Sequence, residues 1–156
     1  MQALRREFRG PRRSAGVAAV EFAIAVPILI FVLLAIAELG RAFVQYDTLS
    51  YSIRNSARYV SENAIVGTTG VVDVSGAVAA AQNLAVYGTS GGGGTPVLPG
   101  FATGHVSVLN AGGGNIEVIA NYPYQPLVGN ALPMFRGGSQ PTTFNMRISV
   151  IMRAIS

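Results

Sequence analysis

The chain contains no cysteine, no tryptophan and a single histidine among its 156 residues. Without cysteine there can be no disulfide, no thiolate nucleophile and no zinc–thiolate site. The one histidine, His105, has no second histidine with which to build a metal site, and we expect it to be a structural residue inside a strand. The sequence therefore predicts no bound metal and no cofactor.

Charged residues are also scarce, at 12% of the chain. The carboxylates outside the main apolar run show no pairing at a spacing that suggests general acid–base chemistry. The glycine run Gly91–Gly94 lacks the lysine and the strand–helix setting of a phosphate-binding loop, so it is read as a flexible loop. We expect a protein that is not an enzyme and has no small-molecule substrate.

The basic residues are all arginine, and five of the eleven precede residue 14. Beyond Gly16 six arginines balance six acids, which argues against a nucleic-acid-binding face because such a face needs clustered positive charge. Positive residues beside a first hydrophobic helix favour the cytoplasmic side of a membrane. The orientation of the chain in the membrane is therefore predicted from its five leader arginines, which are Arg5, Arg6, Arg9, Arg12 and Arg13.

An apolar run from Gly16 to Ala37 follows these arginines, and its only charged residue is Glu21. As a helix, Val17–Ala37 would measure about 31 Å, enough to span the hydrocarbon core and longer than a secretory signal. We expect a single pass through a membrane, with the N-terminus cytoplasmic and the C-terminal head on the opposite side. Pro27 lies inside the run and should kink or loosen the helix.

The helical pattern continues beyond the apolar run, which predicts one helix over residues 17–63, membrane-spanning over 17–37 and amphipathic over 38–63. Residues 1–16 form a basic leader. Arg58 and Glu62 have the spacing of a side-chain pair. The predicted apolar stripe consists of Leu39, Phe43, Tyr46, Leu49, Ile53, Ala57 and Val60, and the predicted polar face includes Arg41, Gln45, Asp47, Ser52 and Arg54.

Residues 64–156 are expected to form a small α+β head. An Ala-rich helix over Val74–Tyr87, capped by Asp73 or Ser75 and ended by Gly88, is predicted to pack on the long helix. Alternating residues predict strands over His105–Asn110, Asn115–Tyr122 and Thr142–Arg153, with a loop containing Gly129, Pro133, Gly137 and Gly138 before the last. The fold class is thus α+β: a long N-terminal helix with a head of one short helix and a three-stranded antiparallel sheet whose apolar face needs the helices as cover.

Glu21 is the one costly residue, since a carboxylate among membrane residues usually marks function. Near the start of the helix it could also simply reach the headgroups or a leader arginine. Its setting, however, is specific: a basic leader, then Gly16, four small apolar residues, Glu21 and Phe22. This arrangement resembles a type IV prepilin. The stretch Arg13–Leu29 with Pro27, the later Glu38-Leu39-Gly40-Arg41 and the tail Tyr122–Leu127 resemble TadE/TadG-like pseudopilins of the tight-adherence (Tad, or Flp) pilus system.

This resemblance implies a minor pilin or pseudopilin, because the major pilin of such systems is a much shorter chain. A prepilin peptidase would cut between Gly16 and Val17, and Glu21 would pair with the new amine of a neighbouring subunit. The implied partners are the inner membrane, the peptidase, other pilins and the Tad assembly platform. The resemblance also implies a bacterial inner membrane with the head on the periplasmic side, and surface adhesion by the processed protein in the extracellular pilus. The alternative is an uncleaved single-pass membrane scaffold of the same machinery.

Overall fold

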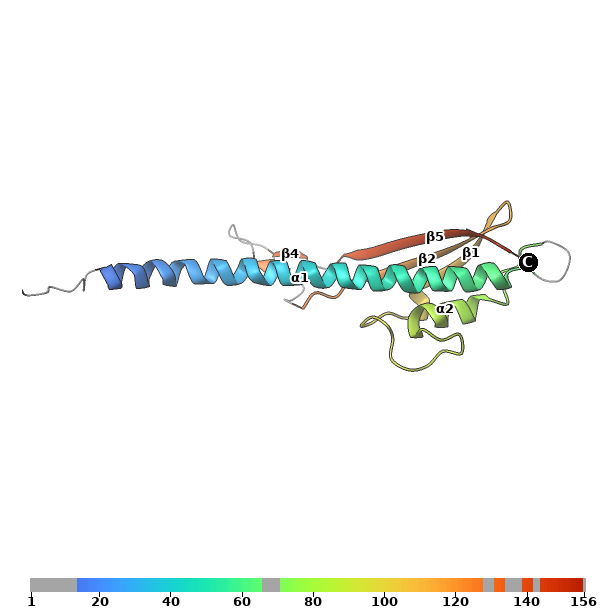
Figure 1. Cartoon of the computed structure of the whole chain (residues 1–156), viewed down its shortest axis with the longest axis horizontal. Coiled ribbons are helices and arrows are strands. Elements are labelled where there is room, and N and C mark those ends of the chain that lie inside the picture. The colour runs from blue at the N-terminus through green and yellow to red at the C-terminus, as the bar shows by residue number, and fades with distance from the viewer. Residues whose placement is uncertain (1–13, 66–70, 128–130, 134–138, 142–143, 156) are drawn as a thin grey trace, which may run out of the picture. The chain divides into compact units, whose positions relative to one another are not determined.

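Helix α1 is a continuous α-helix over Ser14–Asn63 (Figure 1). It begins three residues before the predicted start and ends at the predicted residue, and Pro27 lies inside it without ending it. The chain separates into two compact units, residues 1–37 and 38–156. The computed structural model describes residues 14–65, 71–127, 131–133, 139–141 and 144–155.

The second unit contains one further α-helix and a three-stranded antiparallel sheet in the order β1-β2-β5. The α+β class predicted from the sequence is therefore confirmed. A separate two-stranded sheet pairs β3 with β4. The elements are α2 (Val78–Tyr87), the 3₁₀ helix η1 (Thr103–His105), β1 (Val106–Gly112), β2 (Asn115–Pro123), β3 (Ala131–Pro133), β4 (Ser139–Pro141) and β5 (Asn145–Arg153).

Alternation along the central strand decides which face of the sheet is buried. Val118 pairs with Val108 on one side and Val150 on the other, so apolar residues align in rows across the sheet. The β1–β2 hairpin is as predicted, whereas the last strand begins later than predicted, since Phe144 precedes β5. Proline 123 is the last residue of β2, where a missing N–H does least harm to the ladder. The buried face of β2 consists of Ile116, Val118, Ala120 and Tyr122.

The predicted apolar stripe of α1 is only half correct. Leu49, Ile53, Ala57 and Val60 are fully buried in the core, whereas Leu39, Phe43 and Tyr46 are 59%, 65% and 48% exposed. The position of the head determines which side of the helix is covered, and apolar periodicity does not report that position. The covered face instead includes two residues predicted to be polar and exposed, Gln45 and Ser52.

Both of these buried polar side chains have hydrogen-bond partners. The Tyr122 hydroxyl donates to Gln45 Oε1 at 3.2 Å, and the Ser52 hydroxyl donates to the Leu49 carbonyl at 3.0 Å. Paired in this way, a polar group can be buried without the full desolvation penalty. A helical wheel drawn from the sequence cannot reveal such pairing, because the Gln45 partner is distant in the chain.

Helix α2 packs against the outer part of α1, as predicted (Figure 1). The Ser56 hydroxyl donates to the Ala81 carbonyl at 2.8 Å, and both helices contribute small buried residues such as Ala57 and Ala85 to the core. Gly88 ends α2 with φ of 74°, a conformation that suits glycine. The predicted start was wrong by a turn: α2 begins after Ala77, which provides no side-chain cap.

The error arises because Asp73 caps a local turn instead of the helix. Its carboxylate accepts the Ser75 N–H at 2.9 Å, which is the short-range competition that aspartate offers to helix formation. The Arg58–Glu62 pair is confirmed at 3.0 Å, and it is an exposed pair of small energetic weight.

Two further predictions are corrected. His105 is the last residue of η1 and not part of a strand, because its Nδ1 accepts the Ala102 N–H at 3.2 Å and folds this residue into a turn. Pro133 belongs to β3 and not to a loop, since three residues suffice for a short hairpin pairing that periodicity misses. Gly129, Gly137 and Gly138, with Gly67–Gly70 and Thr142–Thr143, are outside the described residues.

Because only part of the predicted apolar stripe of α1 is buried, substitutions along it should change the free energy of unfolding by very unequal amounts. Ile53→Ala should lower the free energy of unfolding by about 2–5 kcal/mol because it leaves a cavity in the core. Tyr46→Ala should change it by less than about 0.5 kcal/mol because Tyr46 is an exposed residue. Urea titration of the full chain in detergent, followed by tyrosine fluorescence, measures both. Equal losses in the two variants would contradict this assignment of the core.

Candidate functional site

Gly16 lies in the first turn of α1, at the boundary predicted for cleavage. A Cβ atom built on this glycine would meet no described atom within 4 Å. Packing inside the described chain therefore does not require glycine here. A requirement for glycine at this position would have to come from another molecule that binds the segment.

Glu21 lies one helical turn beyond Val17, and at this spacing the two residues share a face of α1. Its side chain is exposed, and Val17 is 69% exposed. Among the described residues the only ion pair joins Arg58 and Glu62, so Glu21 has no such partner within that part of the chain. A carboxylate placed this way is available to a group outside the chain.

The surface around Glu21 is apolar on every side. The candidate membrane span within α1 has a mean hydropathy of 2.8 in its most apolar window, none of which is buried in the protein. An all-round apolar helix needs lipid or other protein as its surroundings. The exposed large side chains are Val17, Val20, Phe22, Ile24, Ile28, Leu29, Ile30, Phe31, Val32, Leu33, Leu34 and Ile36.

Two of the predicted features of this segment stay predictions. The helix is uninterrupted at Pro27, and a kink there is still expected from the lost hydrogen bond. The five leader arginines, Arg5, Arg6, Arg9, Arg12 and Arg13, are outside the described residues.

A second polar cluster, which the sequence did not predict as a site, forms at the start of the second unit, directly after the apolar run. We call Glu38, Tyr124 and Leu127 the Glu38 cluster. The Tyr124 hydroxyl donates to Glu38 Oε1, and the Leu127 N–H donates to both carboxylate oxygens at 3.2 Å. These bonds tie the segment that leaves β2 to α1.

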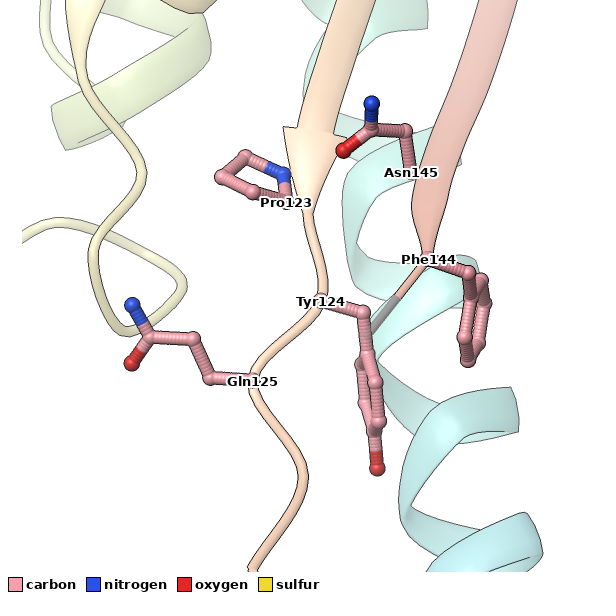
Figure 2. A pocket seen from close by; sticks show the side chains of 5 residues that line it. All are labelled: Pro123, Tyr124, Gln125, Phe144 and Asn145. Atoms are coloured by element: carbon pink, nitrogen blue, oxygen red, sulfur yellow. The ribbon is translucent and has the colours of Figure 1, made fainter. Parts of the chain in front are cut away.

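The Tyr124 ring stacks on Phe144, with 4.9 Å between the centroids. Figure 2 shows the two rings side by side, Tyr124 from the segment after β2 and Phe144 from the residue before β5. They line an open hollow together with Pro123, Gln125 and Asn145. No charged side chain lines this hollow, so its chemistry does not suggest catalysis.

Burial and the nearby carboxylate both disfavour ionisation of the buried phenols. Burial first, and then the hydrogen bond and charge of Glu38, raise the pKa of Tyr124 to about 12. Burial also raises the pKa of Tyr122, whose one hydroxyl hydrogen is shared between the Pro99 carbonyl at 2.9 Å and Gln45 Oε1 at 3.2 Å. The Arg41 guanidinium opposes both shifts, and its buried Nη1 has no hydrogen-bond partner among the described residues.

These values predict how stability responds to alkaline pH. The raised pKa of Tyr124 means that its contribution is complete below pH 10 and is lost as the pH rises towards 12. Tyr124→Phe should lower stability at neutral pH by about 1.5–3 kcal/mol, because a hydrogen bond to a charged group is lost. The same variant should lose less stability between pH 10 and pH 12 than the unmodified chain does.

Urea titrations of the full chain in detergent at several pH values test this prediction. Tyr51→Phe is the control, since Tyr51 is 70% exposed and should reproduce the unmodified profile. Any dependence that persists in Tyr124→Phe belongs to Tyr122. An unchanged alkaline profile in Tyr124→Phe would contradict the coupling to Glu38.

The remaining polar candidates have structural partners. The His105 ring stacks on Phe101 at 6.2 Å between centroids, besides accepting the Ala102 N–H. Within the described part of the chain, no three His, Asp or Glu side chains gather where a metal ion could be held. Gly92 in the glycine run lies against Asn83 of α2, so this loop packs on α2.

Sequence reasoning identified both halves of the Glu38 cluster as separate motifs without joining them. Glu38-Leu39-Gly40-Arg41 follows the apolar run, and Tyr122-Pro123-Tyr124 ends β2, some 86 residues later. The sequence offered one indication of this contact, which is that each polar motif stands at the end of an apolar element. Only the packing of the sheet on α1 shows that they meet.

Comparison with known protein families adds one match. Residues 16–58 match the family model described as TadE-like protein. The match starts at Gly16 and includes Glu21 and Glu38, and it confirms over these residues the resemblance inferred from the sequence. No curated protein and no solved structure matches the chain.

Proposed function

We propose that this chain, TadE-like over residues 16–58, is a minor pilin or pseudopilin of a Tad pilus that is cut between Gly16 and Val17. The observation that carries the proposal is an exposed apolar run in α1, residues 16–37, whose one carboxylate lies five residues after a glycine that packing within the described chain does not require. The role is structural: the helix is an anchor first and an assembly surface afterwards.

Cleavage would be performed by a membrane prepilin peptidase on the cytoplasmic side. Glycine before the scissile bond lets the backbone approach the peptidase closely, because no side chain intervenes. The cut would remove the arginines that hold the N-terminus in the cytoplasm. It would also create an amine at Val17, the new first residue of an apolar helix.

Assembly would then bring that amine to Glu21 of a neighbouring subunit. In a bundle of apolar helices each charge alone would be costly, and the pair offsets that cost. Helices sliding past one another would lose the pairing, so the pair favours one register. Together with other pilins and the assembly platform, such subunits would support pilus biogenesis and surface adhesion.

Intact mass and N-terminal sequencing of protein from membranes and from sheared pili test the proposal. We expect a chain that starts at Val17 in both fractions. A full-length chain confined to the membrane would instead support a permanent single-pass scaffold of the same machinery. An unprocessed chain in the pili would contradict the assigned cut.

A further inference from the structure

Four large apolar side chains remain exposed around the start of the head. Leu127 is 78% exposed and Phe144 is 50% exposed on the segments that leave β2 and enter β5. Leu39 and Phe43 of α1 are 59% and 65% exposed. We call these four residues the apolar collar. Exposed clusters of this kind indicate a surface that meets something other than water.

The Glu38 cluster fixes the level of the collar along α1. Leu127 is bonded through its N–H to Glu38, which directly follows Ala37, the last residue of the predicted span. Phe144 is held near this level by its stacking on Tyr124, whose hydroxyl also reaches Glu38. Phe43 lies about 9 Å beyond Ala37 at the helical rise of 1.5 Å per residue.

These levels match the polar boundary of a bilayer. The headgroup region extends about 5–8 Å beyond the hydrocarbon core on each side. Leu39 lies within it, about 3 Å beyond the span, and Phe43 lies at its outer edge, with its Cα–Cβ bond tilted back toward the membrane. Aromatic side chains are enriched in this layer. At the same level the Glu38 carboxylate accepts hydrogen bonds from the Tyr124 hydroxyl and the Leu127 N–H, and the Arg41 Nη1 is buried. The next acid along α1 is Asp47, about 14 Å beyond Glu38.

The collar is also distributed around the helix. Phe43 follows Glu38 by five residues, which turns it about 140° away from the side where Glu38 holds Leu127. One protein partner docked on one side would cover only part of such a ring. A lipid surface surrounds the helix and meets all four side chains.

We infer that the apolar collar inserts into the headgroup layer of the membrane that α1 spans while the chain is anchored. This inference rests on the anchoring part of the proposed function. The recognised partner is the lipid bilayer itself, through apolar and aromatic insertion and without a specific headgroup. Leaving the membrane for a pilus would require the collar to withdraw from the lipid.

The absence of cysteine makes a direct test possible, since a single introduced cysteine can be labelled alone. Leu127→Cys in the full chain is labelled with an environment-sensitive fluorophore and reconstituted into phosphatidylcholine–phosphatidylglycerol vesicles containing headgroup-spin-labelled lipid. Val71→Cys is the matched control, an exposed aliphatic position in the connection between α1 and α2. We expect severalfold stronger quenching at position 127 than at position 71.

Equal quenching at the two positions would overturn the inference. So would a blue-shifted emission at position 127 that reverts when the protein is diluted with excess lipid, since that reports contact with a second copy. Carbonate extraction of the same vesicles separates this inference from the proposed function. Protein released by carbonate refutes the anchor itself, whereas retained protein without quenching at 127 refutes only the collar.

Discussion

The Gly16→Leu chain is expected to keep its full-length mass in the membrane, with the processed form reduced at least tenfold. A leucine side chain adds no clash within the described protein, because a Cβ at Gly16 meets no described atom within 4 Å. The chain should therefore fold and insert as before. Any block in processing then reports the fit of the scissile segment in the peptidase, where a bulky residue keeps the backbone away.

Gly40→Leu is the matched control for this experiment. Gly40 is also a glycine within α1, and a Cβ there likewise meets nothing within 4 Å. Its substitution should leave cleavage unchanged, since it lies 24 residues beyond the assigned cut. A shortened mass for Gly16→Leu, with Val17 as its first residue, would show that the glycine is not needed for the cut.

The second large effect is expected at Glu21. Glu21→Ala should be cleaved normally, because the carboxylate lies beyond the scissile bond, and should be at least tenfold depleted from sheared pili. Removing one member of a buried ion pair costs about 3–5 kcal/mol because the other charge is left unpaired. Each 1.4 kcal/mol is a factor of ten in an equilibrium, so tenfold is a lower bound.

Comparing two further variants separates charge from shape. Glu21→Gln keeps the size of the side chain and loses the charge, so it should fail to assemble as Glu21→Ala does. Glu62→Ala removes an exposed carboxylate that pairs with Arg58 and should assemble normally. Quantitative mass spectrometry of membrane and pilus fractions provides the readout. Normal incorporation of Glu21→Gln would rule out the pairing with the Val17 amine.

The two experiments have distinguishable failures. If Gly16→Leu is cut normally before Val17, the requirement for glycine at the processing site is wrong, whereas the apolar helix could still assemble. If Glu21→Ala assembles normally, processing stands and the register must be set elsewhere on the helix. If no variant of either kind affects the pilus and the chain is never shortened, the permanent scaffold becomes the better description.

The sequence by itself determined the long N-terminal helix, the α+β class and the TadE-like segment. These properties depend on neighbours in the chain: a continuous apolar run, alternation along strands, Gly88 after a helix, and the spacing from Gly16 to Glu21. Such signals are local, so they survive without knowledge of the packing. The predicted start of α2 was wrong because its local signal was ambiguous. Asp73 could cap either a helix or a turn, and in the structure its carboxylate accepts the Ser75 N–H in a turn.

Only the tertiary structure decided which face of α1 is covered beyond the apolar run. In the structure Gln45 is buried and accepts a hydrogen bond from the Tyr122 hydroxyl, whereas Leu39 and Phe43 are exposed. The reason is that the position of the sheet on the helix is set by contacts between distant segments. The tertiary structure also brought Tyr124 and Leu127 to Glu38 across more than 80 residues of chain. Hydrogen bonds of that range have no periodic signature in a sequence, and they are what fixes the level of the apolar collar.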